Sequence, residues 1–444
     1  MPPKSKDRLR WHGANCRGSA VLAVLLAIAI AGVVLVSLQG SSFAQAAAGR
    51  EAVARLHAKW AARAGIESTI SRFERNILNR DPNSALTEPL DMQDVAYGEL
   101  DRAVWDISHI EGKKIVAGPE DAHAKLNISI MTEQDLASLP NMSEDISAAI
   151  LDWVDADDNV RELGAEEGYY LRLPSPYKPR NAPFKSIAEI ELVAGVYSQD
   201  VRGEDWNLNG RLDPNEDDRA ESWPDDNADG ALDQGWSGLV TTYSVDEGLA
   251  SDGKARLYLA TASADQVVGR IKGLTNPQAQ VILDHASKSG AALQDFISTP
   301  LVSMTPSTIP RASVSNLDTD QIKSLLDDCT LNDPGAGPKP GRLNINTCQR
   351  EELDYIPEIS AGTADLLIFE RNRRATGFTH IMDLAEVGVP ASQVGQLAKL
   401  LDVRSNSYVV TCRGKDTITG IEVEMQAVIS RTELPVPMTE VLVR

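Results

Sequence analysis

One uninterrupted apolar run dominates the N-terminal part of the chain. It covers residues 20–38, and Ala-rich sequence with apolar residues three or four positions apart continues to residue 78. Such spacing places apolar side chains on one face of a helix. Nineteen residues at about 1.5 Å per residue span roughly the hydrocarbon core of a bilayer. The pattern predicts one long helix that is half in lipid and half packed on a domain.

Basic residues precede the apolar run. The first eighteen residues hold one acidic side chain, Asp7, against five basic ones: Lys4, Lys6, Arg8, Arg10 and Arg17. A positive flank keeps this end cytoplasmic, so the body is expected to face outward. A cleaved secretory signal with Ala44-Gln45-Ala46 as its cleavage motif is the alternative. The apolar run exceeds the usual length of about 7 to 15 residues for a signal and continues as a helical pattern, which favours a retained anchor.

The body contains a pattern that occurs three times, in residues 125–155, 256–297 and 342–384. Each copy has a basic residue, a short apolar stretch, a polar cap, a helical pattern, a tight turn and a second helical pattern. We interpret each copy as a helix-hairpin-helix unit of the SAM-like kind.

Local signals add detail to this prediction. Thr132, Thr347 and Ser360 stand where helix N-caps belong, and acidic residues follow them. Near the C-terminus, residues 407–413 and 420–430 alternate as strands do.

An acidic insert lies between the first two repeats. Residues 200–233 hold twelve acidic side chains against three arginines. The stretch 205–216 matches a twelve-residue calcium loop with Gly210 at position 6, because calcium needs six to eight oxygen ligands and the glycine allows the sharp turn. The expected ligands are Asp205, Asn207, Asn209, the Arg211 carbonyl, Asp213 and Glu216.

A second stretch, residues 225–236, matches the same template less completely. Gly230 is at position 6, but Trp236 occupies the position of the bidentate acid, so this loop should bind calcium more weakly or borrow a ligand. Solvated acidic turns are the alternative for both loops. The expected ligands of the second loop are Asp225, Asn227, Asp229, the Ala231 carbonyl and Asp233.

Composition narrows the possible functions. The net charge of −21 repels phosphate backbones, so no nucleic-acid partner is expected. The sequence has no GxSxG, HExxH, GxGxxG or P-loop motif, which predicts a protein that is not an enzyme. The acids of the DWVDADD segment are expected to be structural, with a second cation site or acid/base pair as the alternative. Cys329 and Cys348 either form a disulfide in an oxidising compartment or remain buried thiols.

Several phrases resemble one family. Arg17-Gly18 before the apolar run is similar to a prepilin peptidase site, which predicts cleavage after Gly18 and a mature start at Ser19. Ala23 stands where most pilins have glutamate, and the K-type pseudopilins characteristically lack that residue. DLASLPNMSEDISAAILDWVDADD, GAEEGYYLRL, PYKPRNAPFKSIAEIELVAGV and RLNINT, in this order, are similar to the body of the GspK family, the minor pseudopilin K of type II secretion systems.

The resemblance implies an α+β fold with an inserted helical domain. The segments would be a leader at 1–18, a transmembrane and amphipathic helix at 19–80, a pilin-like part at 81–122, the helical insert at 123–402 with the acidic loops at 200–236, and C-terminal strands at 403–444. Strands near 103–110 and 113–117 would pair with the C-terminal ones in an antiparallel sheet.

The resemblance also implies a function. The chain would be a single-pass inner-membrane protein with a cytoplasmic N-terminus and a periplasmic body. It would cap the pseudopilus tip and initiate its assembly. Its partners would be minor pseudopilins of I and J type, prepilin peptidase and the inner-membrane platform. Calcium, which the loop pattern and not the resemblance predicts, would be a structural cofactor. The alternative is an exported helix-hairpin-helix DNA-binding protein of the competence type, although the turns lack the paired glycines that would expose amides to a phosphate.

Overall fold

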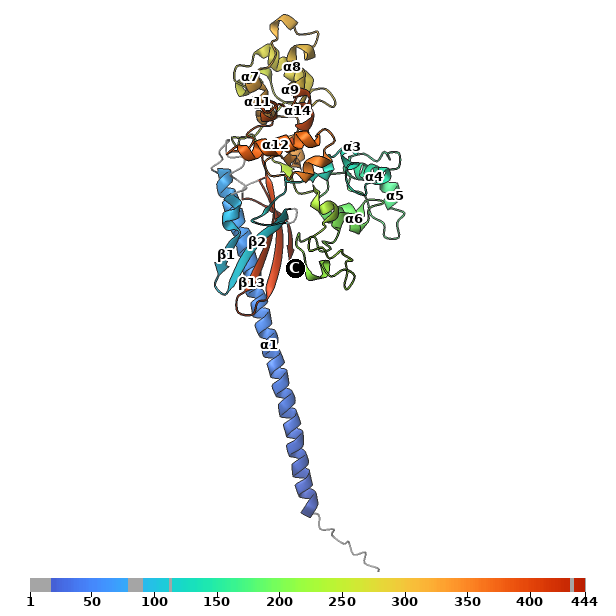
Figure 1. The fold of residues 1–444 in the computed structure, drawn as a ribbon, viewed down its shortest axis with the longest axis vertical. Coiled ribbons are helices and arrows are strands. Elements are labelled where there is room, and N and C mark those ends of the chain that lie inside the picture. The colour runs from blue at the N-terminus through green and yellow to red at the C-terminus, as the bar shows by residue number, and fades with distance from the viewer. Residues whose placement is uncertain (1–16, 79–90, 112–113, 432–434, 444) are drawn as a thin grey trace, which may run out of the picture.

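The computed structural model describes residues 17–78, 91–111, 114–431 and 435–443. A single helix, α1 (Arg17–Leu78), runs along one side of the molecule, and its apolar first half extends well away from the body (Figure 1). The second half packs against an antiparallel sheet, and a large, mostly helical insert lies at the end of the sheet remote from the apolar half (Figure 1).

The sheet has seven strands drawn from both sides of the insert. Its main path is β1-β2-β13-β14-β15, while β3 pairs with β2 and β4 pairs with β13. The predicted pairing of β2 with the C-terminal strands is confirmed, since Ile107 lies opposite Cys412, whereas β3 reaches them only through β2. The strands are β1 (Tyr97–Leu100), β2 (Ala103–Glu111), β3 (Lys114–Ala117), β4 (Glu120–Asp121), β13 (Ser407–Asp416), β14 (Glu422–Ser430) and β15 (Met438–Val443).

Side chains along β13 alternate between the two faces of the sheet, one of which is covered by α1 and the other by the insert. Tyr408, Val410 and Cys412 face α1 and join its Ile66 and Phe73 in one core. The neighbouring Val409 belongs to a smaller cluster on the opposite face, which includes Tyr243 of the insert. Because side chains of a strand point to opposite faces in turn, one strand contacts both the long helix and the insert.

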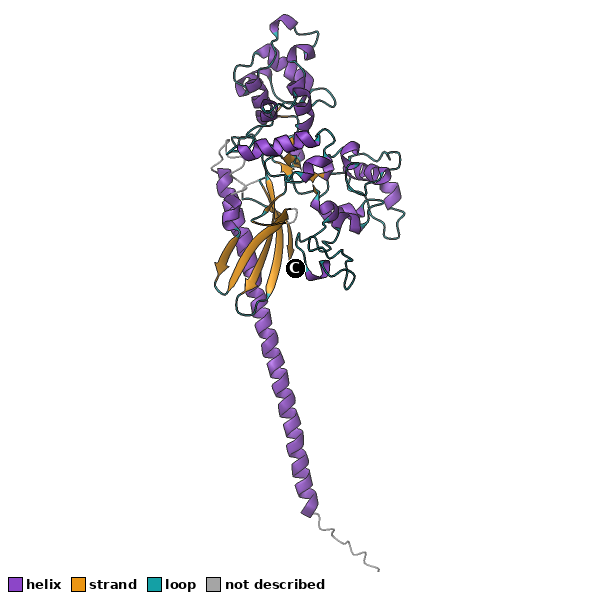
Figure 2. Cartoon of the chain, in the orientation of Figure 1, coloured by secondary structure: helices purple, strands orange, loops and turns teal. Residues whose placement is uncertain are grey.

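Most of the insert is helix and loop (Figure 2). Its α-helices are α3 (Glu133–Leu136), α4 (Glu144–Val154), α5 (Glu167–Tyr170), α6 (Ser198–Arg202), α7 (Ala264–Arg270), α8 (Asn276–Ala286), α9 (Asp295–Ser298), α10 (Leu301–Met304), α11 (Thr319–Asp328), α12 (Ala361–Arg373), α13 (Asp383–Glu386) and α14 (Ala391–Leu397). The 3-10 helices are η1 (Met92–Val95), which precedes β1, and η2 (Ile128–Ile130), η3 (Ile187–Leu192), η4 (Pro214–Glu216), η5 (Gly235–Gly238), η6 (Arg311–Ser313), η7 (Pro334–Ala336) and η8 (Glu351–Tyr355).

Three short parallel ladders recur in the insert at corresponding places. Each joins the start of a sequence repeat to a strand that follows it: β5 (Leu126–Asn127) pairs with β6 (Val240–Thr241), β8 (Leu257–Tyr258) with β9 (Cys329–Thr330), and β11 (Leu343–Asn344) with β12 (Leu401–Asp402). The remaining pair, β7 (Val245–Asp246) with β10 (Lys339–Pro340), is antiparallel. Each of the three repeats is thus closed by a ladder at its base.

Two of the three predicted N-caps are confirmed. Thr132 accepts a hydrogen bond from the Asp135 N–H in a capping box, and Ser360 accepts one from the Thr363 N–H. The prediction for Thr347 is wrong, because the next helix, η8, begins only after Arg350. The Thr347 hydroxyl instead donates to the buried carboxylate of Asp121.

Candidate functional site

The first acidic loop folds tightly around its own carboxylates. Asp205 Oδ1 and Oδ2 accept the backbone N–H groups of Asn209 and Gly210 at 2.9 and 2.8 Å. Glu216 accepts those of Trp206 at 3.1 Å and Asp213 at 3.0 Å. Gly210 has φ of +66°, a conformation that glycine adopts without strain. The loop therefore brings its first and last predicted ligands to one place.

The residues in the middle of this loop are also hydrogen-bonded to one another. Asn207 and Asn209 donate from their side-chain amides to Asp213 Oδ2 at 2.8 and 3.0 Å. The Arg211 N–H donates to Asn209 Oδ1 at 2.8 Å. The five predicted side-chain ligands are thus joined by hydrogen bonds to one another and to the backbone of the same loop.

Burying the carboxyl groups of this loop next to one another costs electrostatic free energy. Asp205 and Glu216 are each 1% exposed. Desolvation, together with the negative charges of Asp205 and Asp213, raises the pKa of Glu216 to about 7 against the effect of two backbone hydrogen bonds. A cation at this place would remove the repulsion, so the residues present fit a calcium ion chemically.

The second loop is held by two residues that sequence matching did not include. Glu204, which is 8% exposed, accepts the N–H groups of Asn227 and Asp233, each at 3.1 Å. The Gly230 N–H donates to Asp217 Oδ1 at 3.1 Å and not to the exposed Asp225. Glu204 and Asp217 therefore occupy the roles that Glu216 and Asp205 have in the first loop.

The other predicted positions of the second loop remain on its turn. Asn227 Oδ1 accepts the Asp229 N–H and Asp229 Oδ1 accepts the Ala231 N–H, both at 2.8 Å. Trp236, at the template's last position, is 1% exposed and donates to the Pro140 carbonyl, so it belongs to the core. The missing bidentate acid thus has a substitute from outside the matched stretch.

A further acidic cluster surrounds the end of α4. Asp152 and Asp155 both contact the Arg161 guanidinium, and Asp152 is fully buried. Glu166 is 2% exposed, and neither of its carboxylate oxygens has a hydrogen-bond partner. Desolvation, followed by the charges of the DWVDADD acids, raises the pKa of Glu166 to about 7. Like Glu216 in the first loop, Glu166 is therefore a buried carboxyl group with negative charges nearby.

Carboxylates, imidazoles and thiolates alone do not form a metal site in the described parts of these three clusters. Within the described ranges, no three or more His, Cys, Asp and Glu side chains are grouped so as to hold a metal by themselves. The template of the first loop instead draws on asparagine and backbone oxygens, which calcium accepts.

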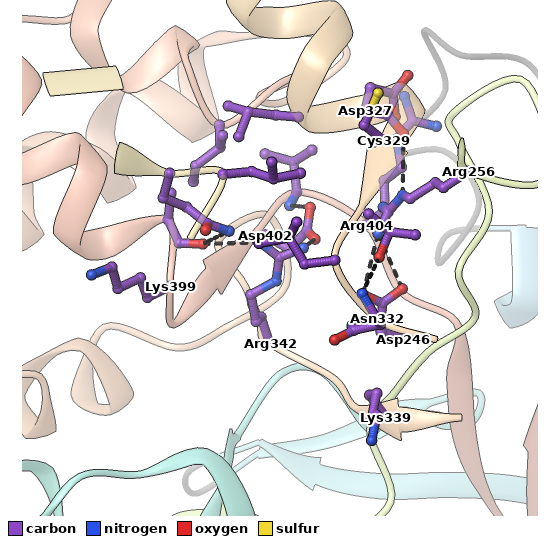
Figure 3. Close-up of a pocket in the computed structure, with 18 of the residues that line it drawn as sticks. Asp246, Arg256, Asp327, Cys329, Asn332, Lys339, Arg342, Lys399, Asp402 and Arg404 are labelled. Carbon is purple, nitrogen blue, oxygen red and sulfur yellow. Dashed lines mark hydrogen bonds and ion pairs between the residues drawn. The ribbon is translucent and has the colours of Figure 1, made fainter. Parts of the chain in front are cut away.

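A cavity of about 460 Å³ lies beside the ladders of the second and third repeats. Figure 3 shows Arg256 between Asp246, to which it donates at 3.2 Å, and Asp327, whose backbone carbonyl it contacts at 3.1 Å. Arg342 pairs with Asp402 at 2.8 Å. The Arg256–Asp327 contact and the Arg342–Asp402 ion pair join segments far apart in sequence, which indicates a structural role for the cavity wall.

The three cysteines in the described part of the chain are free thiols. Cys329 and Cys348 therefore do not form a disulfide, and the alternative of buried thiols is the one observed. Burial raises the pKa of each of these two thiols to about 12, so neither supplies a thiolate nucleophile near neutral pH. Cys412 lies in the core between α1 and the sheet.

The predicted processing site stands at the start of α1. Gly18 and Ser19 are helical, and one helix beginning at Ala20 is long and apolar enough to cross a membrane, with none of its apolar window buried in the body. The leader residues 1–16 lie outside the described residues.

These elements define an α+β protein with one N-terminal apolar helix that fits single-pass membrane anchoring. Residues 114–203 match the family model described as type II secretion system protein K. Proteins named type II secretion system protein K from Pectobacterium carotovorum subsp. carotovorum and Klebsiella pneumoniae are 26% and 25% identical over 207 and 189 residues. These matches support a relationship of the chain to this family, GspK.

These similarities cover part of each protein. The two alignments span 41% and 40% of this chain, and 59% and 58% of the relatives' lengths. A chain in the crystal structure of the GspK-GspI-GspJ complex from enterotoxigenic Escherichia coli matches with a TM-score of 0.44 and 14% identity. That match covers 89% of this chain and 99% of the other.

Proposed function

We propose that this protein is a minor pseudopilin that caps the tip of a type II secretion pseudopilus and initiates its assembly. The observation that carries this proposal is the position of the insert, which lies at the end of the molecule opposite the apolar half of α1 (Figure 1). A fibre built from parallel helices grows by adding subunits at the membrane end. A bulky insert at the opposite end leaves no room for a subunit beyond it, which suits a terminal position.

Partners and location follow from the same proposal. Minor pseudopilins of I and J type would contact the exposed surface of α1, prepilin peptidase would remove the leader, and the inner-membrane platform would receive the helix. The basic flank favours a cytoplasmic N-terminus, which places the body in the periplasm. The similarity to type II secretion system protein K and the exposed apolar helix support this arrangement.

We expect the full chain to restore secretion in a strain that lacks its own protein K and to co-purify with the I-type and J-type subunits of that strain. A matched variant without residues 256–330 keeps the anchor and the sheet, and tests whether the second repeat is needed. Secretion by a strain that expresses neither protein would contradict the proposed role, as would co-purification of DNA in place of the two subunits.

The repeats are, in this proposal, helix-hairpin-helix units used for packing. In the second repeat α7 and α8 are joined by a short turn with Gly273 at φ of +78°. Thr275 caps α8 through the Gln278 N–H. Apolar residues of both helices, including Val267 and Ile282, enter one core. The hairpin therefore uses its apolar face internally.

We further propose that calcium orders the acidic insert, first at residues 205–216 and then at the second loop with Glu204 and Asp217. At a hundredfold excess over Kd, binding stabilises the folded state by about 2.7 kcal/mol. We expect millimolar calcium to raise the melting temperature of the full chain in detergent relative to EDTA, measured by circular dichroism.

The matched variants are Glu216→Gln and Glu221→Gln, since Glu221 is an exposed acid of the same insert outside the predicted ligand sets. Glu216→Gln should remove most of the calcium-dependent shift, whereas Glu221→Gln should leave it unchanged. Equal melting temperatures in EDTA and calcium for the unmodified chain would show that the insert is a solvated acidic segment.

A further inference from the structure

A large cavity separates the β2–β3 end of the sheet from the insert. Its volume is about 1350 Å³, and it is lined by β2, β3, η8 and the second acidic loop. This exceeds the roughly 300 to 1,000 Å³ typical of small-molecule sites. Apolar side chains, among them Ile110, Trp236 and Tyr355, share the wall with the polar ones. The dimensions and the mixed lining suit a segment of polypeptide.

The wall of this cavity is predominantly acidic. Its wall carries ten carboxylates against three lysine and arginine side chains. Three of the ten, Glu204, Asp225 and Asp233, belong to the second proposed calcium loop, so seven remain available to another cationic group. Within the described ranges, Lys125 pairs with Glu120 at 2.6 Å, and Arg371 donates to two backbone carbonyls. The carboxylates are Glu111, Glu120, Asp121, Asp200, Glu204, Asp225, Asp226, Asp233, Glu351 and Glu352. The cavity is therefore strongly negative, and low-dielectric walls focus such a potential on whatever enters.

One of these acids is buried without full compensation. Glu352 is 7% exposed, and its Oε2 atom has no hydrogen-bond partner. Burial raises the pKa of Glu352 to about 7, and the adjacent Glu351 contributes to this against the nearby Lys125. A buried carboxylate oxygen without a donor costs free energy that an incoming cationic group would recover.

We propose that this cavity is a docking groove for a lysine- or arginine-rich segment of a partner protein. The identity of that partner as a subunit of the pseudopilus rests on the proposed function, whereas the chemistry of the groove does not. The acids come from β2, from residues 120–121, from the acidic insert and from η8, and among the described residues they form no set of three or more metal-ligating side chains. Such a distribution matches several cationic side chains on an extended segment.

The test uses the full chain in detergent micelles with 1 mM calcium. The probe is a fluorescein-labelled nonapeptide of alternating lysine and serine, followed by fluorescence anisotropy. Glu351→Gln combined with Glu352→Gln should weaken binding about tenfold, because it removes the Glu351 charge and the Glu352 carboxyl group that an incoming cationic side chain would hold ionised. The control combines Glu99→Gln with Glu144→Gln, two exposed acids outside the cavity, and should change binding less than about twofold.

Location is tested separately by photo-crosslinking. A benzoylphenylalanine at Gln93, which lines the cavity, should crosslink to the peptide, while one at the exposed Gln396 of α14 should not. Equal weakening by both double variants, or equal crosslinking at both positions, would show that the peptide follows net charge alone and would overturn the groove.

The same double variants are compared for secretion in the strain that lacks protein K. A loss with the Glu351/Glu352 pair and not with the control supports a docking partner in the assembly. If the unmodified chain restores secretion and the Glu351/Glu352 variant does so equally, the groove proposal is wrong while the proposed function stands.

Discussion

Gly18→Glu should abolish removal of the first eighteen residues, so that the chain retains its leader and secretion is lost. The unmodified chain should begin at Ser19. The substitution places a charged side chain beside the predicted scissile bond, where the resemblance to prepilin substrates implies that glycine is required. It also adds a carboxylate at the membrane end of the apolar run, where charge is costly. Intact-mass spectrometry of the membrane-extracted proteins shows whether the variant keeps residues 1–18 and whether the unmodified chain begins at Ser19. Secretion is measured separately in the strain that lacks its own protein K.

Ala46→Asp is the matched control for this experiment. It disrupts the alternative cleavage motif at Ala44-Gln45-Ala46 and should leave the Ser19 start unchanged. In the structure α1 passes through these residues without a break, from Arg17 to Leu78. A mature start at Ala47 in the unmodified chain would contradict the retained anchor and favour a secretory signal.

The long helix could be predicted from sequence because two independent patterns indicate it. The apolar run gives the first half, and spacing of three and four gives the second half, in which Ala62, Ile66 and Phe73 enter the sheet core. The strands β13 and β14 were similarly accessible because alternation marks their two faces. In contrast, strands of two residues, such as β5 and β6, have no period that a sequence pattern can reveal.

Tertiary contacts decided the features that could not be predicted. Thr347 has the composition of an N-cap, but its hydroxyl bonds to Asp121, which is remote in sequence. The role of Glu204 in the second loop depends on a contact with Asn227 and Asp233 that lies outside any twelve-residue template. Burial of the Glu352 carboxylate likewise arises from packing of the insert and is invisible in a local charge pattern.

The contact between α1 and the sheet leaves no space for a side chain at Gly414. A Cβ atom at Gly414 of β13 would lie 1.8 Å from the Ala58 carbonyl oxygen and 2.6 Å from the Ala62 nitrogen. Ala58 and Ala62 are fully buried. Because these atoms belong to the helix backbone, no rotation of a side chain relieves the overlap, and the helix and the sheet must separate.

We therefore expect Gly414→Ala to destabilise this part of the molecule by about 3 kcal/mol, at the upper end of overpacking costs. Cys412, two residues away, reports the change locally, because it is a fully buried thiol in the same core. Labelling with a maleimide, followed by peptide mass spectrometry, should show faster modification of Cys412. Cys329 and Cys348, which belong to other cores, should react at their original rates.

Gly362→Ala is the matched substitution, since a Cβ atom at Gly362 of α12 meets nothing within 4 Å. Replacing glycine by alanine within a helix reduces the entropy lost on folding, so this variant should be as stable as the unmodified chain or more stable by up to about 1 kcal/mol. The same substitution of glycine by alanine is thus expected to lower the free energy of unfolding at Gly414 and to leave it unchanged or raise it at Gly362. If maleimide modifies Cys412 at the same rate in Gly414→Ala and in Gly362→Ala, the long helix is not held against β13 at this distance.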